Sequence, residues 1–542
     1  MIGAFLTLLA SMAAAPPEGS PLVFRDVAAE AGVSFRFEAG SRGLHDLPEI
    51  MGGGVVLIDF DGDGRLDIYL CNGGPIVPEA GRPDPPCRLF RNEGDWRFLD
   101  VTDRAGAPGP SYAMGASVGD FDGDGLDDLF VTGWRDQRLY RNAGLGKFED
   151  VTDRAGVGSD LWSTSAAFAD LDGDGDLDLY VAAYLDFDPA FAPFCAAPDG
   201  KRDYCGPEGF AAQPDRLYQN DGDGTFTDVS KDSGVDRPGG RGLGVVVGDL
   251  VGDRGLDIFV ANDGTACRLF ENRGGLRFEE VGLASGVALD GRGDALAGMG
   301  VALGDIDGDG LDDLVVGNFL GRSTIGFRAI GGGMFLDDSD GLGLSTTRVV
   351  LGFGLALADF DLDGRLDLLQ ANGHVLDRAR LGQPFAMRPT LLRNRGGRLA
   401  DVTPEAGPWF ARPILGRGLA VGDLDGDGRI DAVVNALDAP AAVLRNISEA
   451  GRSLRLDLIG RHPSPRSAIG AKVRATFGGR TLSRIVLGGG GYLSSSDRSM
   501  ILGLGDSEGV DRLEVTWPSG RVETWRDLKA GRLKIEEGTA PR

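Results

Sequence analysis

A nine-residue acidic motif that recurs seven times, the apolar segments beside each copy, and a high glycine content predict an all-β fold. The predicted architecture is a seven-bladed β-propeller with a small C-terminal β-sandwich or barrel-like domain. The motif, Asp-x-Asp-Gly-Asp-Gly-x-x-Asp or a close variant, starts at Asp59, Asp120, Asp170, Asp249, Asp305, Asp359 and Asp423. Glycine supplies 88 of the 542 residues, against a usual share of roughly 7%. Without a Gly-X-Y period this content indicates many tight turns.

Each repeat contains four strand-like segments. A strand of small residues precedes the acidic motif and an apolar strand follows it, as in residues 52–70. A third strand, an Asn-x-Gly turn and a fourth strand come next, as in residues 88–102. Seven units of four short strands are typical of a propeller, in which radial repetition protects the sheet edges. The glycine-rich and alanine-rich first strands suit a crowded central channel.

The two ends of the repeat region complete each other. The seventh unit stops after its third strand, near Asn446, and Val23–Val27 copies the missing fourth strand. We therefore expect residues 21–27 to close the last blade, so that the propeller spans residues 21–448. A different pattern of alternating strands begins near Ser453, and it predicts a second domain over residues 453–538.

The acidic motifs have the chemistry of calcium loops. Carboxylates at positions 1, 3, 5 and 9 can converge on one ion, position 7 can offer its backbone carbonyl, and hard oxygen ligands on a flexible loop favour calcium. A leucine at Leu70, where an EF-hand has its acidic twelfth residue, argues against that motif. The expected ligands are Asp59, Asp61, Asp63, Arg65 and Asp67; Asp120, Asp122, Asp124, Leu126 and Asp128; Asp170, Asp172, Asp174, Asp176 and Asp178; Asp305, Asp307, Asp309, Leu311 and Asp313; Asp359, Asp361, Asp363, Arg365 and Asp367; and Asp423, Asp425, Asp427, Arg429 and Asp431.

Two copies of the motif depart from it. The copy at Asp249 has Val251 at position 3 and Arg254 in place of a glycine, so we expect that site to be empty or weak. The copy at Asp359 has Leu362 where the others have glycine, a milder change. We favour calcium as a structural staple of each hairpin over a sensor or ligand bridge, because clustered carboxylates repel one another and metal binding adds to folding free energy.

These repeats resemble the FG-GAP/VCBS family, which is known from integrin α-chain propellers and many exported bacterial proteins. The resemblance covers about Val23 to Asn446, and it implies a seven-bladed propeller with calcium in the hairpin loops. The later motifs, Arg466–Ala471, Gly488–Ser494, Leu502–Gly505 and Val515–Gly520, are similar to the ASPIC/UnbV domain. The whole chain thus resembles bacterial members of the cartilage acidic protein family, which implies calcium binding and an extracellular location but no settled molecular function.

The N-terminus and the cysteines bear on location. Residues 1–15 resemble a signal peptide that lacks a basic residue before its apolar core. No other stretch is long and apolar enough to span a bilayer, so we expect a secreted, extracellular or periplasmic protein. Cys195 and Cys205 are close enough in sequence to pair, Cys71 and Cys87 bracket another loop, and Cys267 is left over. Five buried free thiols remain the alternative.

Charge separates the two predicted domains. The chain carries a net charge of −27, and residues 452–542 hold 16 Lys/Arg against 10 Asp/Glu, so that segment is +6 and the remainder is −33. The overall acidity argues against nucleic acid as a partner. The positive charge of the C-terminal segment has three alternative interpretations. The segment docks on the acidic propeller, it binds an anionic glycan, lipid or nucleic acid, or it is an ordinary solvated surface.

The sequence favours a binding protein, for an extracellular glycan or protein, over an enzyme. With three histidines and no nucleophile, zinc-protease or phosphate-loop motif, no catalytic residue is assigned. The alternative is a glycan-active hydrolase or lyase that uses carboxylates such as Asp186/Asp188 or Asp46/Glu49, and His374 is a further candidate. We expect the ligand on the face opposite the acidic loops, where the long connections 72–87, 186–214 and 373–389 carry Phe191, Phe194, Tyr204, Phe210 and Phe385.

Six complete carboxylate sets predict about six bound calcium ions per chain. Elemental analysis after exhaustive dialysis against trace calcium measures this number directly. Zero or one ion per chain would contradict the ligand assignment.

Overall fold

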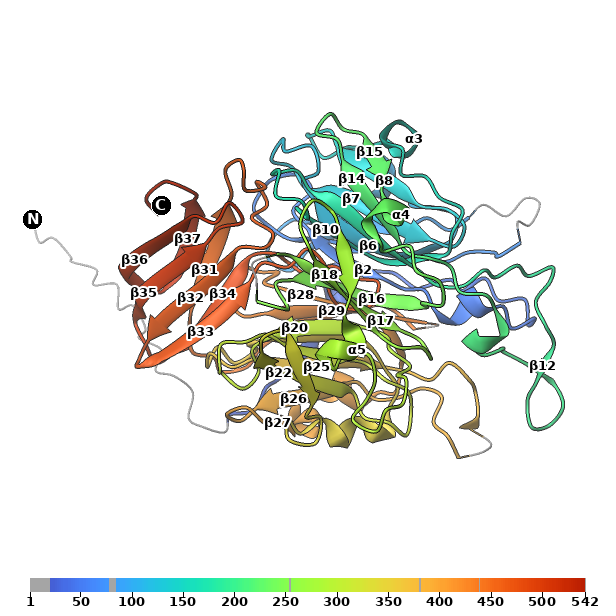
Figure 1. Ribbon diagram of the computed structural model, residues 1–542. Coiled ribbons are helices and arrows are strands. Elements are labelled where there is room, and N and C mark those ends of the chain that lie inside the picture. The colour runs from blue at the N-terminus through green and yellow to red at the C-terminus, as the bar shows by residue number, and fades with distance from the viewer. Residues whose placement is uncertain (1–19, 78–83, 253–254, 380–381, 438, 542) are drawn as a thin grey trace, which may run out of the picture.

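The computed structural model of the protein describes residues 20–541, except 78–83, 253–254, 380–381 and 438. The all-β prediction is confirmed, because strands dominate and helical segments are single turns (Figure 1). Among the described residues before 450, seven antiparallel sheets of four strands each follow one another around a common centre. The expected signal peptide, residues 1–15, lies outside the described residues.

Five blades are built from consecutive strands, and in blade 3 the short strands β12 (Cys195–Ala196) and β13 (Arg202–Asp203) intervene between the second and third strands. In each blade the listed strands pair in the order given, from the centre outward. Blade 1 has β2 (Val55–Ile58), β3 (Asp67–Leu70), β4 (Arg88–Asn92) and β5 (Phe98–Asp100); blade 2 has β6 (Ala113–Gly119), β7 (Asp128–Gly133), β8 (Arg138–Asn142) and β9 (Phe148–Asp150); blade 3 has β10 (Ser163–Ala169), β11 (Asp178–Ala183), β14 (Arg216–Asn220) and β15 (Phe226–Asp228). Blade 4 has β16 (Gly242–Gly248), β17 (Asp257–Asn262), β18 (Arg268–Asn272) and β19 (Phe278–Glu280); blade 5 has β20 (Val301–Gly304), β21 (Asp313–Val316), β22 (Ile325–Gly331) and β23 (Met334–Asp337); blade 6 has β24 (Gly352–Ala358), β25 (Asp367–Asn372), β26 (Thr390–Asn394) and β27 (Leu399–Asp401).

Short helical turns connect the blades. A four-residue α-turn follows the outer strand of several blades and ends at a left-handed glycine, such as Gly106 with φ 79°. The α-turns are α1 (Ala28–Ala31), α2 (Thr102–Ala105), α3 (Thr152–Ala155), α4 (Ser230–Ser233) and α5 (Gly282–Ser285). The 3-10 turns are η1 (Leu47–Ile50), η2 (Pro207–Gly209), η3 (Leu344–Val349), η5 (Thr403–Glu405) and η6 (Pro408–Ala411).

Blade 7 combines both ends of the propeller. Its inner strands are β28 (Leu415–Gly422), β29 (Asp431–Leu437) and β30 (Ala442–Asn446), and β1 (Phe24–Asp26) is the outer one. Phe24 pairs with Asn446, and its ring, 1% exposed, packs on Phe360 and Phe410 at centroid distances of 5.4 and 5.9 Å. This strand covers an edge of β30 that would otherwise be open for pairing with another chain.

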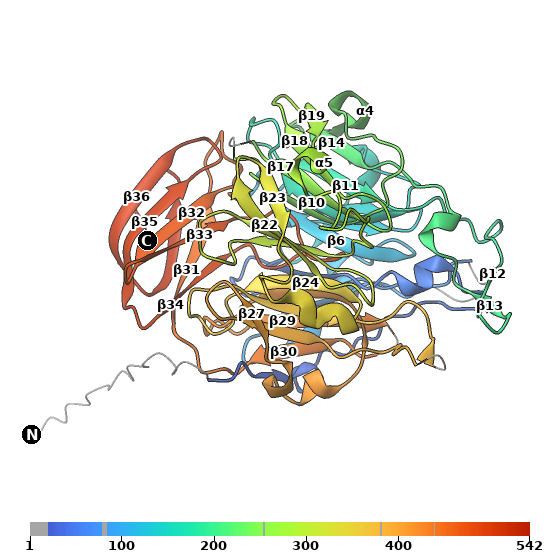
Figure 2. The ribbon, with the colours of Figure 1, turned by 60° about the horizontal axis from the view of Figure 1, so that its bottom comes forward.

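The C-terminal segment forms two sheets around one core. The first sheet has the order β34-β31-β37, from β31 (Arg452–Ile459), β34 (Met500–Gly505) and β37 (Gly531–Glu536). The second has the order β33-β32-β35-β36, from β32 (Lys472–Phe477), β33 (Arg480–Ile485), β35 (Gly509–Thr516) and β36 (Val522–Lys529). Buried side chains from both sheets, including Leu454, Phe477 and Trp517, share one hydrophobic cluster with residues of blades 2 to 4. Both views show this domain at one side of the propeller (Figures 1 and 2).

A loop of the C-terminal domain fills the centre of the propeller. This channel segment, residues 488–499, hydrogen-bonds to first strands of several blades: the Leu57 N–H donates to Ser495 O at 3.0 Å, Phe168 N–H to Gly488 O at 3.0 Å and Val301 N–H to Gly491 O at 3.0 Å. A Cβ atom at Gly54 or Gly115 would lie 2.1 or 2.4 Å from the carbonyl oxygen of Leu493. The glycines of the first strands therefore make room for this segment.

Removing residues 1–27 should destabilise the protein far more than removing residues 1–15, because only the first truncation deletes β1. Phe24→Ala should lower the free energy of unfolding by about 3–5 kcal/mol, as expected for a buried aromatic side chain, whereas Arg25→Ala at the exposed neighbouring position should have little effect. Chemical denaturation measures all four variants. Equal stability of the two truncations would contradict the role of β1.

Candidate metal centres

The acidic loops bring three aspartates of each motif together. Ligand oxygens of the first, third and ninth residues lie within 4.8 Å of one another in a geometry that could hold a metal ion. Such groups include Asp59, Asp61 and Asp67; Asp120, Asp122 and Asp128; Asp170, Asp172 and Asp178; Asp305, Asp307 and Asp313; and Asp359, Asp361 and Asp367. Each loop joins the first and second strands of its blade, so the strands fix where these oxygens meet.

Backbone N–H groups hold the first and ninth residues in place. Asp59 accepts hydrogen bonds from the N–H of Asp63 at 3.0 Å and of Gly64 at 2.9 Å. Asp67 accepts from Phe60 N–H at 3.1 Å and from Asn92 N–H at 2.7 Å. The bend needs left-handed backbone at position 4, which glycine supplies elsewhere and which Leu362 adopts at φ 57°. Leu362 therefore keeps the loop shape at some conformational cost.

The fifth position behaves differently from the expectation that it converges with the others. Asp63 accepts the N–H of Arg65 at 3.0 Å and forms an ion pair with the Arg65 guanidinium, and the Asp363–Arg365 and Asp427–Arg429 pairs repeat this pattern. The groups of converging oxygens listed above contain no fifth-position aspartate. These carboxylates would have to turn toward an ion in order to bind it.

Burial disfavours the ionised form of these carboxylates when no cation is bound. Desolvation is the main cause that raises the pKa of Asp67 to about 8, of Asp128 to about 9 and of Asp178 to about 8. Neighbouring carboxylates of the same loop raise these values further, and the hydrogen bonds from backbone N–H groups oppose the shift only in part. A bound cation would remove both penalties at once.

An asparagine from the next blade ties successive loops together, a contact that sequence analysis missed. The side-chain amide of Asn142 in blade 2 donates to Phe60 O in the loop of blade 1 at 2.8 Å and to Asp127 O of its own loop at 3.0 Å. The same bond between blades, always at 2.8 Å, is made by Asn92, Asn220, Asn272, Asn394 and Asn446. The recurring Asn-x-Gly sequence is the available signal for this contact, but by itself it predicts only a turn.

This ring of asparagines is interrupted beside the atypical loop of blade 4. Ala329 of blade 5 occupies the corresponding position, since its N–H donates to Asp313 as the asparagine N–H groups do in other blades. In the same loop, Asp249 is 2.5 Å from Nζ of Lys472, which comes from the C-terminal domain. The lysine ammonium thus supplies the positive charge in the loop that lacks a third-position carboxylate; Asp253 and Arg254 lie outside the described residues.

Other basic groups of the C-terminal domain also face the acidic loops. Arg498 Nη2 is 2.5 Å from Asp127 Oδ1, and Arg455 Nη1 is 3.6 Å from Asp423 Oδ2. Burial raises the pKa of Asp312, in the loop of blade 5, to about 6, and the charges of Lys472 and Arg484 oppose that rise. Basic side chains of the +6 domain therefore contact acidic loops of the propeller, as the docking interpretation of the charge separation expects.

The candidates for catalysis are mostly engaged in structural contacts. His374 is 2% exposed, its Nδ1 accepts the Leu376 N–H at 2.9 Å, and burial lowers its pKa to about 4. Asp46 pairs with Arg42 at 3.0 Å, and Glu49 accepts a hydrogen bond from the Tyr204 hydroxyl at 2.8 Å. Asp188 is 3.6 Å from Arg135. The other oxygen of Glu49, Oε1, is buried without a hydrogen-bond partner.

The cysteines divide into one disulfide and three thiols. Cys195 and Cys205 form a disulfide, which joins the small hairpin of β12 (Cys195–Ala196) and β13 (Arg202–Asp203). Cys71, Cys87 and Cys267 are buried free thiols. Residues 195–205 therefore form a cross-linked loop in the long connection of blade 3.

The metal-free protein should lose stability as pH rises from 5 to 9. The folded-state pKa values of Asp67, Asp128 and Asp178 lie above the ordinary value of 3.8, so the stability that protonation provides is lost as pH passes through about 8 to 9. With calcium the trend should flatten or reverse, because the metal binds the deprotonated form. Melting curves at several pH values, with and without calcium, measure this.

Asp61→Ala should remove part of the calcium-dependent rise in melting temperature, whereas Val251→Ala should not, since only Asp61 belongs to a converging group. Metal-free protein that gains stability between pH 5 and 9 would contradict this account of the loops.

Comparison with known proteins agrees with the repeat pattern. A model of the FG-GAP-like repeat matches residues 59–131, 120–181, 198–260 and 249–316, and a model of the ASPIC and UnbV domain matches residues 461–542. Cartilage acidic protein 1 is 31% identical over 322 residues in Homo sapiens and 32% identical over 328 residues in Xenopus tropicalis, which is 56% and 57% of this chain. The matches span 45% and 46% of those relatives, so the chain corresponds to about half of their length.

Solved structures show weaker likeness. An Agrocybe aegerita lectin, described as recognising non-reducing terminal N-acetylglucosamine, is 17% identical with a TM-score of 0.39, covering 72% of this chain and 86% of its own. PorZ, a surface component of the Porphyromonas gingivalis type-IX secretion system, is 12% identical with a TM-score of 0.41, covering 86% and 58%. The chain thus contains FG-GAP-like repeats followed by an ASPIC and UnbV domain, and in this architecture it is similar to cartilage acidic protein 1.

Proposed function

We propose that the protein is an exported, calcium-binding recognition or adhesion protein. About six calcium ions staple the hairpin loops, and a glycan or protein ligand binds the face opposite those loops. In this proposal residues 21–448 form the propeller, residues 21–27 close its last blade, and residues 453–538 form the domain that docks on it.

Two features of the acidic loops favour calcium: the oxygen ligands that they offer, and buried carboxylate oxygens that have no hydrogen-bond donor. The converging groups consist of carboxylate oxygens on flexible loops, which are the ligands of a hard cation of variable geometry. Asp61 and Asp120 each keep one buried oxygen without a hydrogen-bond partner. Such an oxygen costs free energy unless a cation or a donor reaches it.

The position of the C-terminal domain supports the proposal that the ligand binds the face opposite the acidic loops. This domain contacts part of the acidic-loop side, with Lys472 and Arg498 paired to loop aspartates and the channel segment in the centre. The disulfide hairpin of β12 and β13 projects from the other side of the propeller (Figure 2). The C-terminal domain therefore lies away from the described part of the face that carries this hairpin.

Exposed aromatic side chains mark a candidate contact on that face. Phe191 and Phe194, beside the disulfide hairpin, are 85% and 64% exposed. Large exposed aromatics that are held on a cross-linked loop are typical of ligand anchors. Tyr204, Phe210 and Phe385 are only partly exposed and pack against the core, so they support the loops.

The hairpin is held by contacts with neighbouring loops, which would preorganise the exposed rings. Arg202 Nε donates to Leu44 O at 2.6 Å, and Arg378 is 3.5 Å from Asp203. Preorganised loops bind with a smaller entropic cost.

One observation favours export. The Cys195–Cys205 disulfide is of a kind that persists in oxidising compartments. Among the residues that the structure describes, no helix has the length and apolar character needed to cross a membrane.

The double variant Phe191→Ala/Phe194→Ala should lose binding to ligands found by a calcium-containing glycan and protein array, with no change in calcium content. Leu145→Ala is the matched control, because Leu145 is 94% exposed but lies in the turn between β8 and β9, on the acidic-loop side. Loss of binding in the control alone, or new reducing ends or unsaturated products from a polysaccharide panel, would contradict the proposal; the latter result would favour the hydrolase or lyase alternative.

A further inference from the structure

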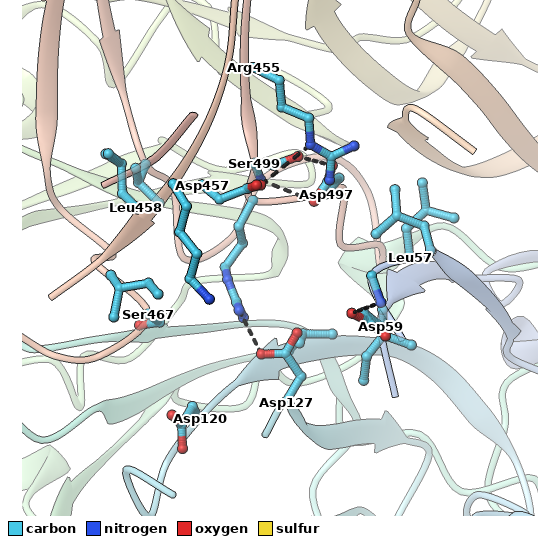
Figure 3. Close-up of a pocket in the computed structure, with 18 of the residues that line it drawn as sticks. Leu57, Asp59, Asp120, Asp127, Arg455, Asp457, Leu458, Ser467, Asp497 and Ser499 are labelled. Atoms are coloured by element: carbon cyan, nitrogen blue, oxygen red, sulfur yellow. Dashed lines mark hydrogen bonds and ion pairs between the residues drawn. The ribbon is translucent and has the colours of Figure 1, made fainter. Parts of the chain in front are cut away.

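A cavity lies between the propeller and the C-terminal domain, away from the face proposed for the main ligand. It has a volume of about 270 Å³ and is lined by the acidic loops of blades 1 and 2, by β31 and β37, and by residues 496–499. This volume holds several waters or one small charged group. Figure 3 shows Ser467, Asp120, Asp127 and Asp59 around its lower part.

The acidic side chains contributed by the C-terminal domain are already neutralised. Asp457 accepts a hydrogen bond from Arg532 Nε at 2.6 Å and also pairs with Arg455 at 3.4 Å. Asp497 is 3.8 Å from Arg455 and accepts a hydrogen bond from the Ser499 hydroxyl. These carboxylates, visible with Arg455 in Figure 3, have little remaining capacity to hold another cation.

Several donors in the same cavity lack an acceptor. Arg498 pairs with Asp127 through Nη2, while its Nη1 is buried without a hydrogen-bond partner. The Ser467 hydroxyl is likewise buried and unpartnered. Arg65 of the lining pairs with Asp63, whereas Arg466 and Lys534 form no ion pair with a carboxylate among the residues that the structure describes. An acceptor with several oxygens would satisfy these donors together.

The remaining carboxylates of the cavity belong to the acidic loops. Asp59 and Asp120 line it, and both belong to the groups that could hold a metal ion. Without a cation they would repel an anion, and with calcium their charge is balanced. This dependence on calcium rests on the proposed function, whereas the unsatisfied donors do not.

We propose that this interdomain cavity binds one oxyanion group, a sulfate, phosphate or carboxylate, through Arg466, Arg498, Lys534 and Ser467. Arg466 and Lys534 are exposed, so the cavity is reachable from solvent, and the group can be a free ion or the terminal charge of a larger molecule such as a sulfated glycan.

Isothermal titration of the calcium-loaded full chain with inorganic sulfate, inorganic phosphate, acetate and glucose 6-sulfate tests this, with glucose as the neutral control and chloride used to keep the ionic strength constant. One saturable site per chain is expected for at least one anion. Tighter binding of glucose 6-sulfate than of inorganic sulfate identifies an ester as the ligand, and the reverse order identifies a free ion.

Arg466→Ala/Lys534→Ala should weaken that binding about tenfold or more, as the loss of charge-assisted hydrogen bonds predicts. Arg526→Ala/Lys529→Ala removes the same two charges from exposed positions on β36 and should leave binding unchanged. Absence of saturable binding in the native chain, or equal weakening in both variants, would overturn the proposal.

Elemental analysis of the same samples reports calcium independently. A chain without calcium that still binds the anion would contradict the proposed function and leave the oxyanion site standing. A chain that holds about six calcium ions and binds no anion would support the proposed function and contradict the oxyanion site.

Discussion

Concentrated negative charge on one face of the propeller is the constraint on which the rest of the structure depends. The loop aspartates lie between the first and second strands of each blade, and burial raises the pKa values of Asp67 and Asp128. The molecule meets this cost in three ways: backbone N–H groups donate to the first and ninth residues, basic side chains approach from the C-terminal domain, and the converging oxygens leave room for a cation. Hydrogen bonds alone leave the pKa values high, and a bound cation, for which we propose calcium, would supply the remaining compensation.

The two domains complement each other around this charge. The acidic repeat region carries −33 and the C-terminal segment +6, and the basic residues Lys472, Arg455 and Arg498 reach different loops. The channel segment adds backbone hydrogen bonds at the centre, where the glycines of the first strands allow close approach. Docking is thus a second use of the same carboxylates. The domain contacts part of the loop face, and the hairpin of β12 and β13 lies on the opposite side of the propeller (Figure 2).

Much of the fold was predictable because its determinants are local and repeated. The position of each acidic motif between two strands fixed the hairpins, and the copy of a fourth strand at Val23–Val27 indicated the partner of β30. Contacts between distant segments were not predictable from spacing. The asparagine ring depends on how one blade sits against the next, and the Lys472–Asp249 pair depends on how the domains meet. The exposure of the aromatic residues was also not predictable. The sequence places Phe191 and Phe210 in one loop, but only the structure shows that, of these two, Phe191 is largely exposed.

We propose that metal ions occupy the converging aspartates and that the loop of blade 4 uses a lysine instead. Crystals of the full chain grown with calcium, measured at a wavelength where calcium scatters anomalously, test both parts at once. The account predicts an anomalous peak between the first, third and ninth aspartates of the complete loops, and no peak beside Asp249, where Lys472 lies. Loops without peaks, or a peak at Asp249 with Lys472 displaced, would contradict it.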